Sequence, residues 1–395
     1  MKHVILIADG MNDRPLKELD GATPLEVANT PNMDNMAQRG ALIGVVRNVP
    51  RGFKPGSDVA IMSLLGYDPK LFYTGRGPLE AANLGLELGD NQIAFRCNFV
   101  TVAEGKMIDY SSSHIGNRET NVLIEGLNKN FGSKKFKFYA GISYRNLLIS
   151  EGIGGDVKTV PPHDIMGEEI VKFLPSGLDS ELIKELMLKS QDFLSSHDVN
   201  RVRLDLGENP ANMIWLWGQG RRPSFPSFDK KYEVNGFVIS AVDLVNGMAG
   251  LMGLEVVKVP GVTGYYDTNY IAKGEYAIKH LKKHDFCCVH LEATDEAGHN
   301  GDLREKIKAI ESFDRHIVGP IYNYLEKDKD YRILISSDHA TPVGMRVHTE
   351  EPVAFICYGK YIDSDIKLKY FNEKNARATL LEYTGPKLIE EVLFK

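Results

Sequence analysis

The sequence predicts an α/β protein with a doubly wound, mostly parallel sheet and an inserted smaller α/β (α+β) domain. Short apolar runs alternate with helical patterns at both ends of the 395-residue chain, as is typical of parallel strands buried on both faces. From about residue 84 to 227 the strand-like segments are shorter and more polar. We therefore expect an outer domain of residues 1–82 and 229–395 and an inserted domain of residues 83–228.

The N-terminal elements are predicted from residues that typically begin or end strands and helices. Residues 4–8 form a β-branched apolar run that ends at Asp9-Gly10, which predicts a buried strand followed by a turn. A helix is expected to begin after Thr30, with Pro31 at its first position, and to end at Gly40. The sequence Gly56-Ser57-Asp58 precedes a second, short helix.

The remaining elements are predicted from apolar runs and helical periodicity. In the middle of the chain we expect strands at 136–139 and 147–150, a helix at 179–194 and a linker at 221–227. Towards the C-terminus, helices are expected at 243–251, 269–281 and 302–325. Strands are expected at 237–241, 254–259, 286–291, 331–336 and 353–358.

Composition excludes several classes of protein. The chain has 47 basic and 53 acidic residues, a net charge of −6 and no long basic stripe, so a nucleic acid is not the expected partner. No run approaches the roughly 18 apolar residues of a membrane span, and the run at 4–8 is too short for a secretion signal. The four cysteines lie in apolar, strand-like segments and do not form a disulfide pattern, which favours a cytoplasmic location. Composition leaves the oligomeric state open.

Metal-ligand side chains follow three predicted strands. Asp9 follows the first strand, Asp295 and His299 follow the strand at 286–291, and Asp338-His339 follows the strand at 331–336, with His348 nearby. Each residue alone is an ordinary turn or cap residue. Together they place six ligands at one edge of one sheet, where α/β proteins bind ligands. Carboxylate and imidazole donors suit Mn²⁺, Zn²⁺, Co²⁺ or Mg²⁺, and six donors suit two ions, as in phosphoryl transfer.

Ser57 is the candidate nucleophile. A serine at a helix start is most often only an N-cap. The helix N-terminus also favours an anionic alkoxide or phosphoserine, and a nearby divalent metal ion activates a hydroxyl group.

This set of site residues resembles that of the alkaline phosphatase superfamily. More closely, it is similar to that of the archaeal type of cofactor-independent phosphoglycerate mutase. The resemblance covers nearly the whole chain and rests on five motifs: Ala8-Asp9-Gly10-Met11, Pro55-Gly56-Ser57-Asp58-Val59, residues 73–80, residues 295–299, and Asp338-His339 with His348. It implies an alkaline-phosphatase-like fold and two divalent cations, with manganese favoured. Asp295, His299 and His348 would hold one cation, and Asp9, Ser57, Asp338 and His339 the other. Ser57 would be phosphorylated transiently while 3-phosphoglycerate and 2-phosphoglycerate interconvert, with no bisphosphoglycerate required.

The inserted domain is expected to bind this small phosphorylated substrate. Arginine matches both a carboxylate and a phosphate, and the substrate-binding candidates are His114, Arg145, Asn146, His163 and Arg221. The larger bacterial mutases have an Arg-Asp pair whose Asp transfers protons, where this chain has Arg145-Asn146. Asn146 cannot transfer a proton, so His114 is the candidate acid/base and Arg145 a further catalytic candidate.

Three other functions are alternatives to the mutase reaction. Bacterial sequences of this family with patterns such as Pro161-Pro162-His163-Asp164-Ile165 have been proposed as homoserine kinases. A kinase of this kind would transfer phosphate at the same site. A phosphomonoesterase or sulfatase would resolve the intermediate with water. A non-catalytic, metal-stabilised binding protein would never carry a phosphate on Ser57.

Overall fold

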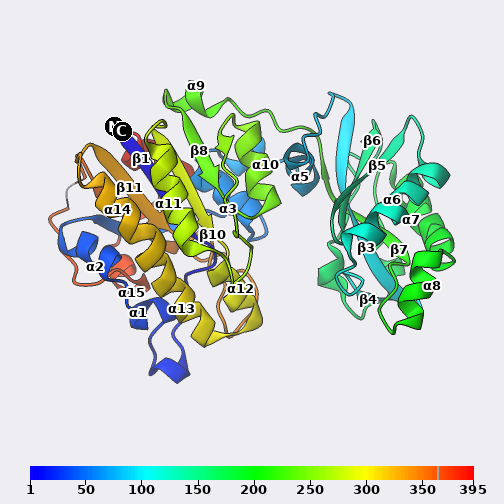
Figure 1. Ribbon diagram of the computed structural model, residues 1–395, viewed down its shortest axis with the longest axis horizontal. Helices are drawn as coiled ribbons and strands as arrows, with labels where there is room; N and C mark the ends of the chain where they lie inside the picture. The colour runs from blue at the N-terminus through cyan, green and yellow to red at the C-terminus, as the bar shows by residue number, and fades with distance from the viewer. Residues whose placement is uncertain (363) are drawn as a thin grey trace. The chain divides into compact units, whose positions relative to one another are not determined.

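The computed structural model describes residues 1–362 and 364–395, and these form two compact units (Figure 1). Unit 1 comprises Met1–Tyr73 and Phe225–Lys395, and unit 2 comprises Thr74–Ser224. Helix α5 (Arg76–Asn83) lies in unit 2, whereas the sequence assigned it to the outer domain. The reason is close packing: a Cβ atom on Gly77 would lie only 2.3 Å from the carbonyl oxygen of Ala94 on strand β3.

Unit 1 contains a mixed sheet of eight strands in the order β13-β2-β12-β11-β1-β10-β8-β9. Strand β1 lies parallel to both of its neighbours, and only β12 runs antiparallel to the strands beside it. The predicted mostly parallel α/β class is therefore confirmed. The strands are β1 (Lys2–Ala8), β2 (Leu42–Arg47), β8 (Gly236–Ile239), β9 (Glu255–Val256), β10 (Phe286–Leu291), β11 (Tyr331–Ser336), β12 (Val353–Gly359) and β13 (Glu382–Thr384).

Helices pack against the sheet, and an apolar core lies between the sheet and these helices. Alternate residues of β1, such as Val4 and Leu6, share one buried cluster with Ile310 and Phe313, because successive strand residues face opposite sides of a sheet. The helices of unit 1 are α1 (Pro24–Val27), α2 (Pro31–Gln38), α3 (Ser57–Leu64), α4 (Pro69–Phe72), α9 (Phe228–Tyr232), α10 (Asp243–Leu251), α11 (Tyr270–Leu281), α12 (Ala293–Asn300), α13 (Leu303–Phe313), α14 (Gly319–Leu325), α15 (Glu373–Ala378) and α16 (Gly385–Leu388).

The single helix expected at 302–325 is interrupted. Helices α13 and α14 are joined by a π-helical turn, Asp314–Val318, in which the amide of Gly319 donates to the carbonyl oxygen of Asp314. Pro320 has no amide hydrogen to continue the normal ladder, and this favours a break in the regular helix here. The apolar periodicity persists across the break, which is why the sequence pattern did not reveal it.

One predicted strand near the edge of the sheet was too long, and another strand was missed. The strand expected at 254–259 contains only Glu255–Val256, and Pro260-Gly261 follows shortly after it. Strand β2 was not predicted, although it pairs with both β12 and β13. Gly44 lies inside the apolar run of β2, and Pro260 lies shortly after β9, so neither segment resembles a regular strand in the sequence.

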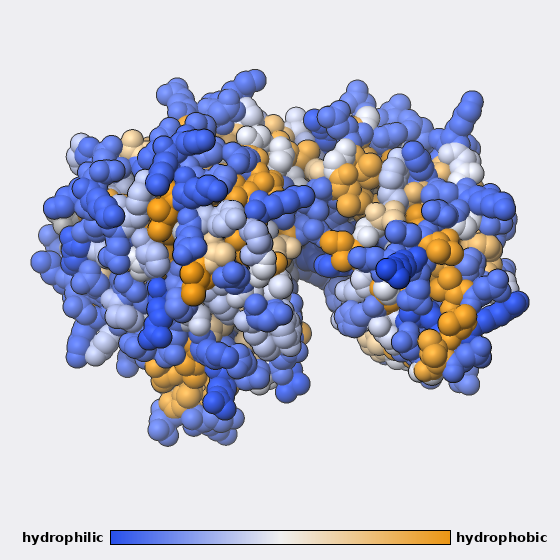
Figure 2. Space-filling view, in the orientation of Figure 1, coloured by the Kyte–Doolittle hydropathy of each residue, from blue (hydrophilic) through white to orange (hydrophobic). Residues whose placement is uncertain are grey.

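Unit 2 has an antiparallel sheet of five strands in which β3 pairs with β4, β6 and β7, and β5 pairs with β6. The visible face of the molecule is mostly hydrophilic, with smaller hydrophobic areas (Figure 2). Within residues 1–362 and 364–395, no helix combines the length and apolar character that a bilayer crossing requires. The strands are β3 (Gln92–Ala103), β4 (Lys106–Asp109), β5 (Phe136–Ile142), β6 (Arg145–Glu151) and β7 (Met213–Gly220), and the remaining helices are α6 (Asn117–Phe131), α7 (Ser180–Ser195) and α8 (Asp198–Asp205).

Candidate active site

The carboxyl ends of three adjacent parallel strands bring the predicted ligands of unit 1 together. Ala8 pairs with Leu291 and Ile7 pairs with Ser336, so the residues that follow β1, β10 and β11 emerge at the same sheet edge. Asp9 follows β1 directly. Asp295 and His299 lie on α12 after β10, and Asp338 and His339 follow β11. Register alone therefore gathers side chains that are up to 330 residues apart in the sequence.

Ser57 lies at the first position of α3, and its hydroxyl faces this edge. Its Oγ donates to Oδ2 of Asp9 at 3.3 Å and lies 3.3 Å from Nε2 of His339. Gly56 before it is extended, with φ of 175°, and no side chain caps the helix. The hydroxyl is therefore directed towards the carboxylates and imidazoles instead of serving as an N-cap.

Two buried carboxylate oxygens beside Ser57 accept no hydrogen bond. They are Oδ1 of Asp9 and Oδ2 of Asp338, whose side chains are at most 4% exposed. Burial raises the pKa of Asp9 well above its ordinary value, and the charges of Asp338 and Asp295 raise it further. Buried anionic oxygens without donors are costly, and a divalent cation would satisfy both atoms.

A second ligand group lies beside the first. Nε2 of His299 lies 2.8 Å from Nε2 of His348, and both nitrogens lie within 3.5 Å of an oxygen of Asp295. The other ring nitrogens face backbone carbonyl oxygens, of Arg346 for His299 at 3.0 Å and of Pro55 for His348 at 3.3 Å. A carbonyl oxygen only accepts, so each Nδ1 carries a hydrogen, and in the neutral rings the two Nε2 lone pairs would face each other.

That arrangement requires a positive charge between the two rings. Burial lowers the pKa of His299, but the carboxylate of Asp295 outweighs it and raises the pKa to about 9. Burial opposes ionisation of Asp295 in turn, yet hydrogen bonds from His299 and His348 hold its pKa well below the ordinary range. A divalent cation fits these donors.

The two ligand groups adjoin through His339. Its ring lies against that of His348, with centroids 3.9 Å apart. Ligand atoms of Asp9, Asp295 and His339 also lie within 4.8 Å of one another. Burial, reinforced by His348 and opposed by Asp338, lowers the pKa of His339 to about 4, so this ring stays neutral and keeps a lone pair available.

Sequence reasoning missed a chain of buried charges behind Asp9. Nε2 of His290 lies 3.0 Å from Oδ2 of Asp9, and Nδ1 lies 3.1 Å from Oε1 of Glu292. Lys273, which is fully buried, donates to Oε2 of Glu292 at 2.8 Å. Burial lowers the pKa of His290, but Glu292 and Asp9 outweigh burial and raise it to about 10. A histidine and a glutamate flanking the end of a core strand were the signal that could have revealed this chain.

Three of the predicted substrate residues gather in unit 2 around aromatic rings. His114 and Arg145 both lie against Tyr144, at 5.7 and 5.9 Å. His163 lies 5.5 Å from Trp217. Arg96, which was not predicted, lies over the same Trp217 ring at 4.3 Å and pairs with Glu80 at 3.0 Å. A buried arginine inside a strand has no distinctive sequence pattern.

The loop that carries His114 is strained. Ser112, Ser113 and His114 all have positive φ, between 49° and 51°, which is costly for residues other than glycine. The buried Arg203 holds this conformation by donating to the carbonyl oxygen of Ser112 at 2.6 Å, and Asp109 accepts from the amide of Ser113 at 2.6 Å. Strain that is held in this way is typical of functional loops.

Asn146 lies beside this aromatic group with its side chain bonded to the backbone, and Arg221 lies apart from the group. The amide of Asn146 is buried and occupied locally, since it accepts from Gly141 and donates to the carbonyl oxygen of Tyr144. Arg221 follows Gly220, which pairs with Ala94, whereas Arg145 pairs with Asn98 further along β3. Arg221 donates to the carbonyl oxygen of Asp90 at 3.2 Å.

Comparison with known proteins adds the class and the family. The family model described as 2,3-bisphosphoglycerate-independent phosphoglycerate mutase matches residues 37–200. A mutase of that description from Methanothermobacter thermautotrophicus is 50% identical over 95% of this chain and 93% of its own length. A probable one from Geobacter sulfurreducens is 47% identical over the full length of both chains.

Solved structures agree. A protein from Pyrococcus horikoshii superposes with a TM-score of 0.82 at 31% identity, covering 99% of this chain and 96% of that one. The cofactor-independent phosphoglycerate mutase of Thermoplasma acidophilum gives 0.67 at 27% identity, covering 99% of both chains. Fold and relatives define an α/β phosphotransfer enzyme. The chain belongs to the family of 2,3-bisphosphoglycerate-independent phosphoglycerate mutases, and the resemblance stated from its motifs is confirmed.

Proposed function

We propose that this chain interconverts 3-phosphoglycerate and 2-phosphoglycerate through a phosphoserine at Ser57, without bisphosphoglycerate. The observation that carries the proposal is the position of the Ser57 hydroxyl, 3.3 Å from Asp9 Oδ2 and 3.3 Å from His339 Nε2, at the N-terminus of α3. The helix N-terminus favours the negative charge of an alkoxide or of a phosphate on this residue.

The donor set fits two divalent cations. Asp295, His299 and His348 would hold one, and Asp9, Ser57, Asp338 and His339 would hold the other. The two orphaned oxygens of Asp9 and Asp338 and the facing lone pairs of His299 and His348 support this assignment. Mixed oxygen and nitrogen donors suit Mn²⁺, Mg²⁺, Co²⁺ or Zn²⁺, and the family resemblance favours Mn²⁺ among them. Such ions, when bound, favour the deprotonated serine and stabilise charge on the attacking and leaving oxygens.

The chain's own groups account for the transfer. Oγ of Ser57 attacks the phosphorus of 3-phosphoglycerate, and the bond from phosphorus to the 3-oxygen of glycerate breaks as phosphoserine forms. The released oxygen takes a proton. After glycerate reorients, its 2-hydroxyl loses a proton and attacks the phosphoserine, which regenerates Ser57 and yields 2-phosphoglycerate.

His114 is the acid/base we propose, and Arg145 the partner of an anionic group of the substrate. His114 is exposed on a strained loop beside Tyr144, and an imidazole can both donate and accept a proton. His163 and Arg221 remain substrate-binding candidates. We propose the buried Asn146 as a positioning residue for this group, because its amide holds the backbone beside Tyr144.

A direct assay tests the proposal. Purified protein with Mn²⁺ and 3-phosphoglycerate, and with no bisphosphoglycerate, should form 2-phosphoglycerate, and the peptide containing Ser57 should carry a phosphoryl group after rapid quenching. Ser57→Ala should abolish both signals while the circular dichroism spectrum shows an unchanged fold. The matched control is Ser63→Ala on the same helix, whose hydroxyl donates only to the carbonyl oxygen of Asn48; it should retain turnover. Phosphate release alone, or transfer from ATP to homoserine, would contradict the proposal.

A cytoplasmic location is proposed as well. Cys97, Cys287, Cys288 and Cys357 are all buried free thiols, and burial raises the pKa of Cys288 to about 12, which disfavours the reactive thiolate. Buried free thiols of this kind are common in reducing compartments.

A further inference from the structure

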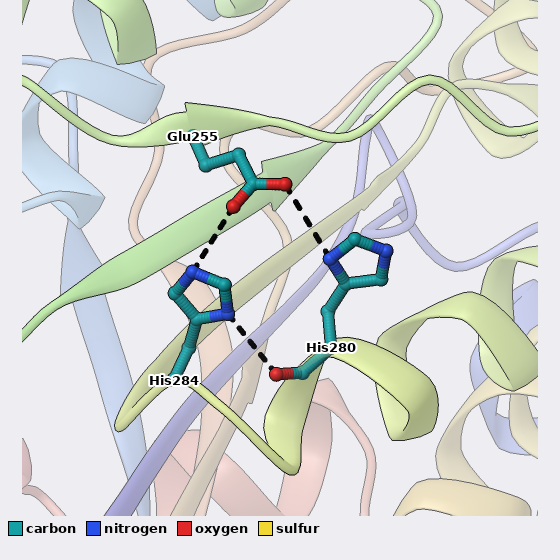
Figure 3. Close-up of side chains that lie close together, drawn as sticks. All are labelled: Glu255, His280 and His284. Carbon is teal, nitrogen blue, oxygen red and sulfur yellow. Dashed lines mark hydrogen bonds and ion pairs between the residues drawn. The ribbon is translucent and has the colours of Figure 1, made fainter.

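A third histidine–carboxylate cluster lies in unit 1, away from Ser57 (Figure 3). It consists of Glu255 on β9, His280 in the last turn of α11, and His284 in the turn that follows. His284 precedes Phe286, where β10 begins, and Glu255 is the first residue of β9. The cluster therefore lies at the amino ends of the strands, whereas Asp9 and Asp338 follow the carboxyl ends of theirs.

The three side chains converge on one point. Oε2 of Glu255 lies 3.1 Å from Nε2 of His284, and Oε1 lies 3.5 Å from Nδ1 of His280. Figure 3 shows the carboxylate placed between the two rings. Ligands about 2.1 Å from a tetrahedral zinc ion lie roughly 3.4 Å from one another. The two observed nitrogen–oxygen distances are close to that value, and one ligand atom of each residue lies within 4.8 Å of the others, so side-chain adjustments would admit an ion.

The tautomer of His284 is fixed by the backbone. Its Nδ1 lies 3.0 Å from the carbonyl oxygen of His280, and because a carbonyl oxygen only accepts, Nδ1 must carry the hydrogen. In the neutral ring the lone pair of Nε2 then points at a carboxylate oxygen of Glu255. Two lone pairs at 3.1 Å repel unless a cation lies between them. Backbone carbonyls that orient ligand histidines in this way are a regular feature of metal sites.

Packing holds the imidazoles in place. The ring of the fully buried Phe237 lies 5.4 Å from His280 and 5.2 Å from His284. The histidine side chains are only 23% and 16% exposed, while Glu255 is 49% exposed and leaves the cluster accessible from solvent. The rings therefore lose little rotamer freedom when an ion binds, and the ion has a route of entry.

We propose that Glu255, His280 and His284 bind one divalent transition-metal cation of the zinc class, with water completing its coordination. Two imidazole nitrogens and one carboxylate favour Zn²⁺, Co²⁺ or Ni²⁺ over Mg²⁺ and Ca²⁺. The ion would join α11 to β9. That strand has only two residues, at the edge of the sheet, and its pairing with β8 is the contact that the ion would reinforce.

Ion counting with the full chain tests the proposal. Protein is first incubated with excess Mn²⁺, then titrated with Zn²⁺, desalted, and analysed for zinc and manganese. The double variant His280→Asn/His284→Gln should retain one metal ion fewer per chain than the unsubstituted protein. Under the same conditions Zn²⁺ should raise the unfolding midpoint of the unsubstituted protein more than that of the variant. Mutase turnover with Mn²⁺ should be equal in the two.

The matched control is His316→Asn, which removes a histidine of the π-helical turn outside the cluster. It should retain as many ions as the unsubstituted protein. If the double variant cannot be purified folded, Glu255→Gln provides the same comparison through the carboxylate. Equal metal content in the cluster variant and the unsubstituted protein would overturn the proposal and leave the cluster as a histidine–glutamate ion pair. Because the readout is an ion difference, it is independent of whether Ser57 transfers phosphate.

Discussion

Nε2 of His290 lies 3.0 Å from Oδ2 of Asp9, the same oxygen that accepts from the hydroxyl of Ser57. The carboxylate of Asp9 is thus held between the candidate nucleophile and a buried imidazolium. Behind it, Glu292 and Lys273 continue an alternating series of charges. A series of this kind fixes Asp9 in one rotamer, and each member is satisfied only while its neighbours are present.

Removal of Lys273 should be costly. Lys273→Met leaves Glu292 with one charged partner fewer in a buried setting, and breaking a buried pair costs about 3–5 kcal/mol. Urea unfolding measures this loss. Lys279→Met, on the exposed face of the same helix, should change stability by less than about 0.5 kcal/mol. The double variant Lys273→Met/Glu292→Gln should recover part of the loss, and no recovery would show that the two residues are not coupled.

Gly10 tests the tightness of the site. It has φ of +61°, and a Cβ atom there would lie 2.6 Å from both Oδ1 of Asp295 and Oγ1 of Thr341. We expect Gly10→Ala to lower kcat/KM by about 100-fold, because displacements near 1 Å at reacting groups have effects of this size. Gly21→Ala is the control, since Gly21 also has positive φ, of +85°, but its Cβ would meet nothing within 4 Å. Equal losses in both variants would assign the effect to backbone strain.

Metal removal should destabilise the protein as well as inactivate it. Chelation leaves the neighbouring carboxylates of Asp9, Asp295 and Asp338 to repel one another. An ion supplied at 100 times its Kd stabilises the folded state by about 2.7 kcal/mol. Differential scanning calorimetry with and without Mn²⁺ should therefore show a higher unfolding midpoint in its presence. Asp338→Asn should reduce this Mn²⁺-dependent increase, and an undiminished increase would remove Asp338 from the proposed ligands.

His3 predicts a pH dependence remote from the site. It is 5% exposed, its ring nitrogens have no hydrogen-bond partner, and it lies 4.4 Å from the ring of Phe394. Burial lowers its pKa from 6.5 to about 4. The unfolded chain then binds this proton more tightly than the folded one. The free energy of unfolding therefore falls as the pH drops below 6.5, and levels off below about 4.

At pH 5 this linkage costs about 2 kcal/mol relative to pH 7. His3→Phe should remove that part of the slope, because an apolar ring has no proton to take up. Urea unfolding of the two proteins at pH 7 and pH 5 gives the difference directly. Parallel pH dependences in the two would show that His3 does not contribute.

The convergence of the candidate metal ligands at one sheet edge could be predicted because strand ends are visible in the sequence. An apolar run followed by Asp9 or by Asp338-His339 marks both the strand and its carboxyl end, and parallel pairing then brings such residues together. His290 could not be found in the same way. It is a single polar residue in the apolar strand β10. Its buried charge network includes Lys273, which contacts it from helix α11, and this contact leaves no local sequence pattern.

The inserted unit was harder to predict for a related reason. Arg96 and Trp217 form one contact, but they belong to antiparallel strands more than 100 residues apart, and no local pattern marks either. The left-handed loop at His114 is likewise maintained by Arg203, a residue on a helix far along the chain. Secondary-structure propensities depend on residues that are close in the sequence. They do not include stabilising contacts from residues far along the chain.

The order of strands also has a consequence for synthesis. Within residues 1–362 and 364–395, β1 pairs with β10 and β11, and β2 pairs with β12 and β13. The first strands to leave the ribosome therefore wait for partners that begin at Phe286, while every strand of unit 2 pairs within its own 151 residues. Domains fold as units during translation. The nascent chain can thus complete the unit that carries His114 first, whereas β1 and β2 lack these partners until the segment from Phe286 onwards has been made.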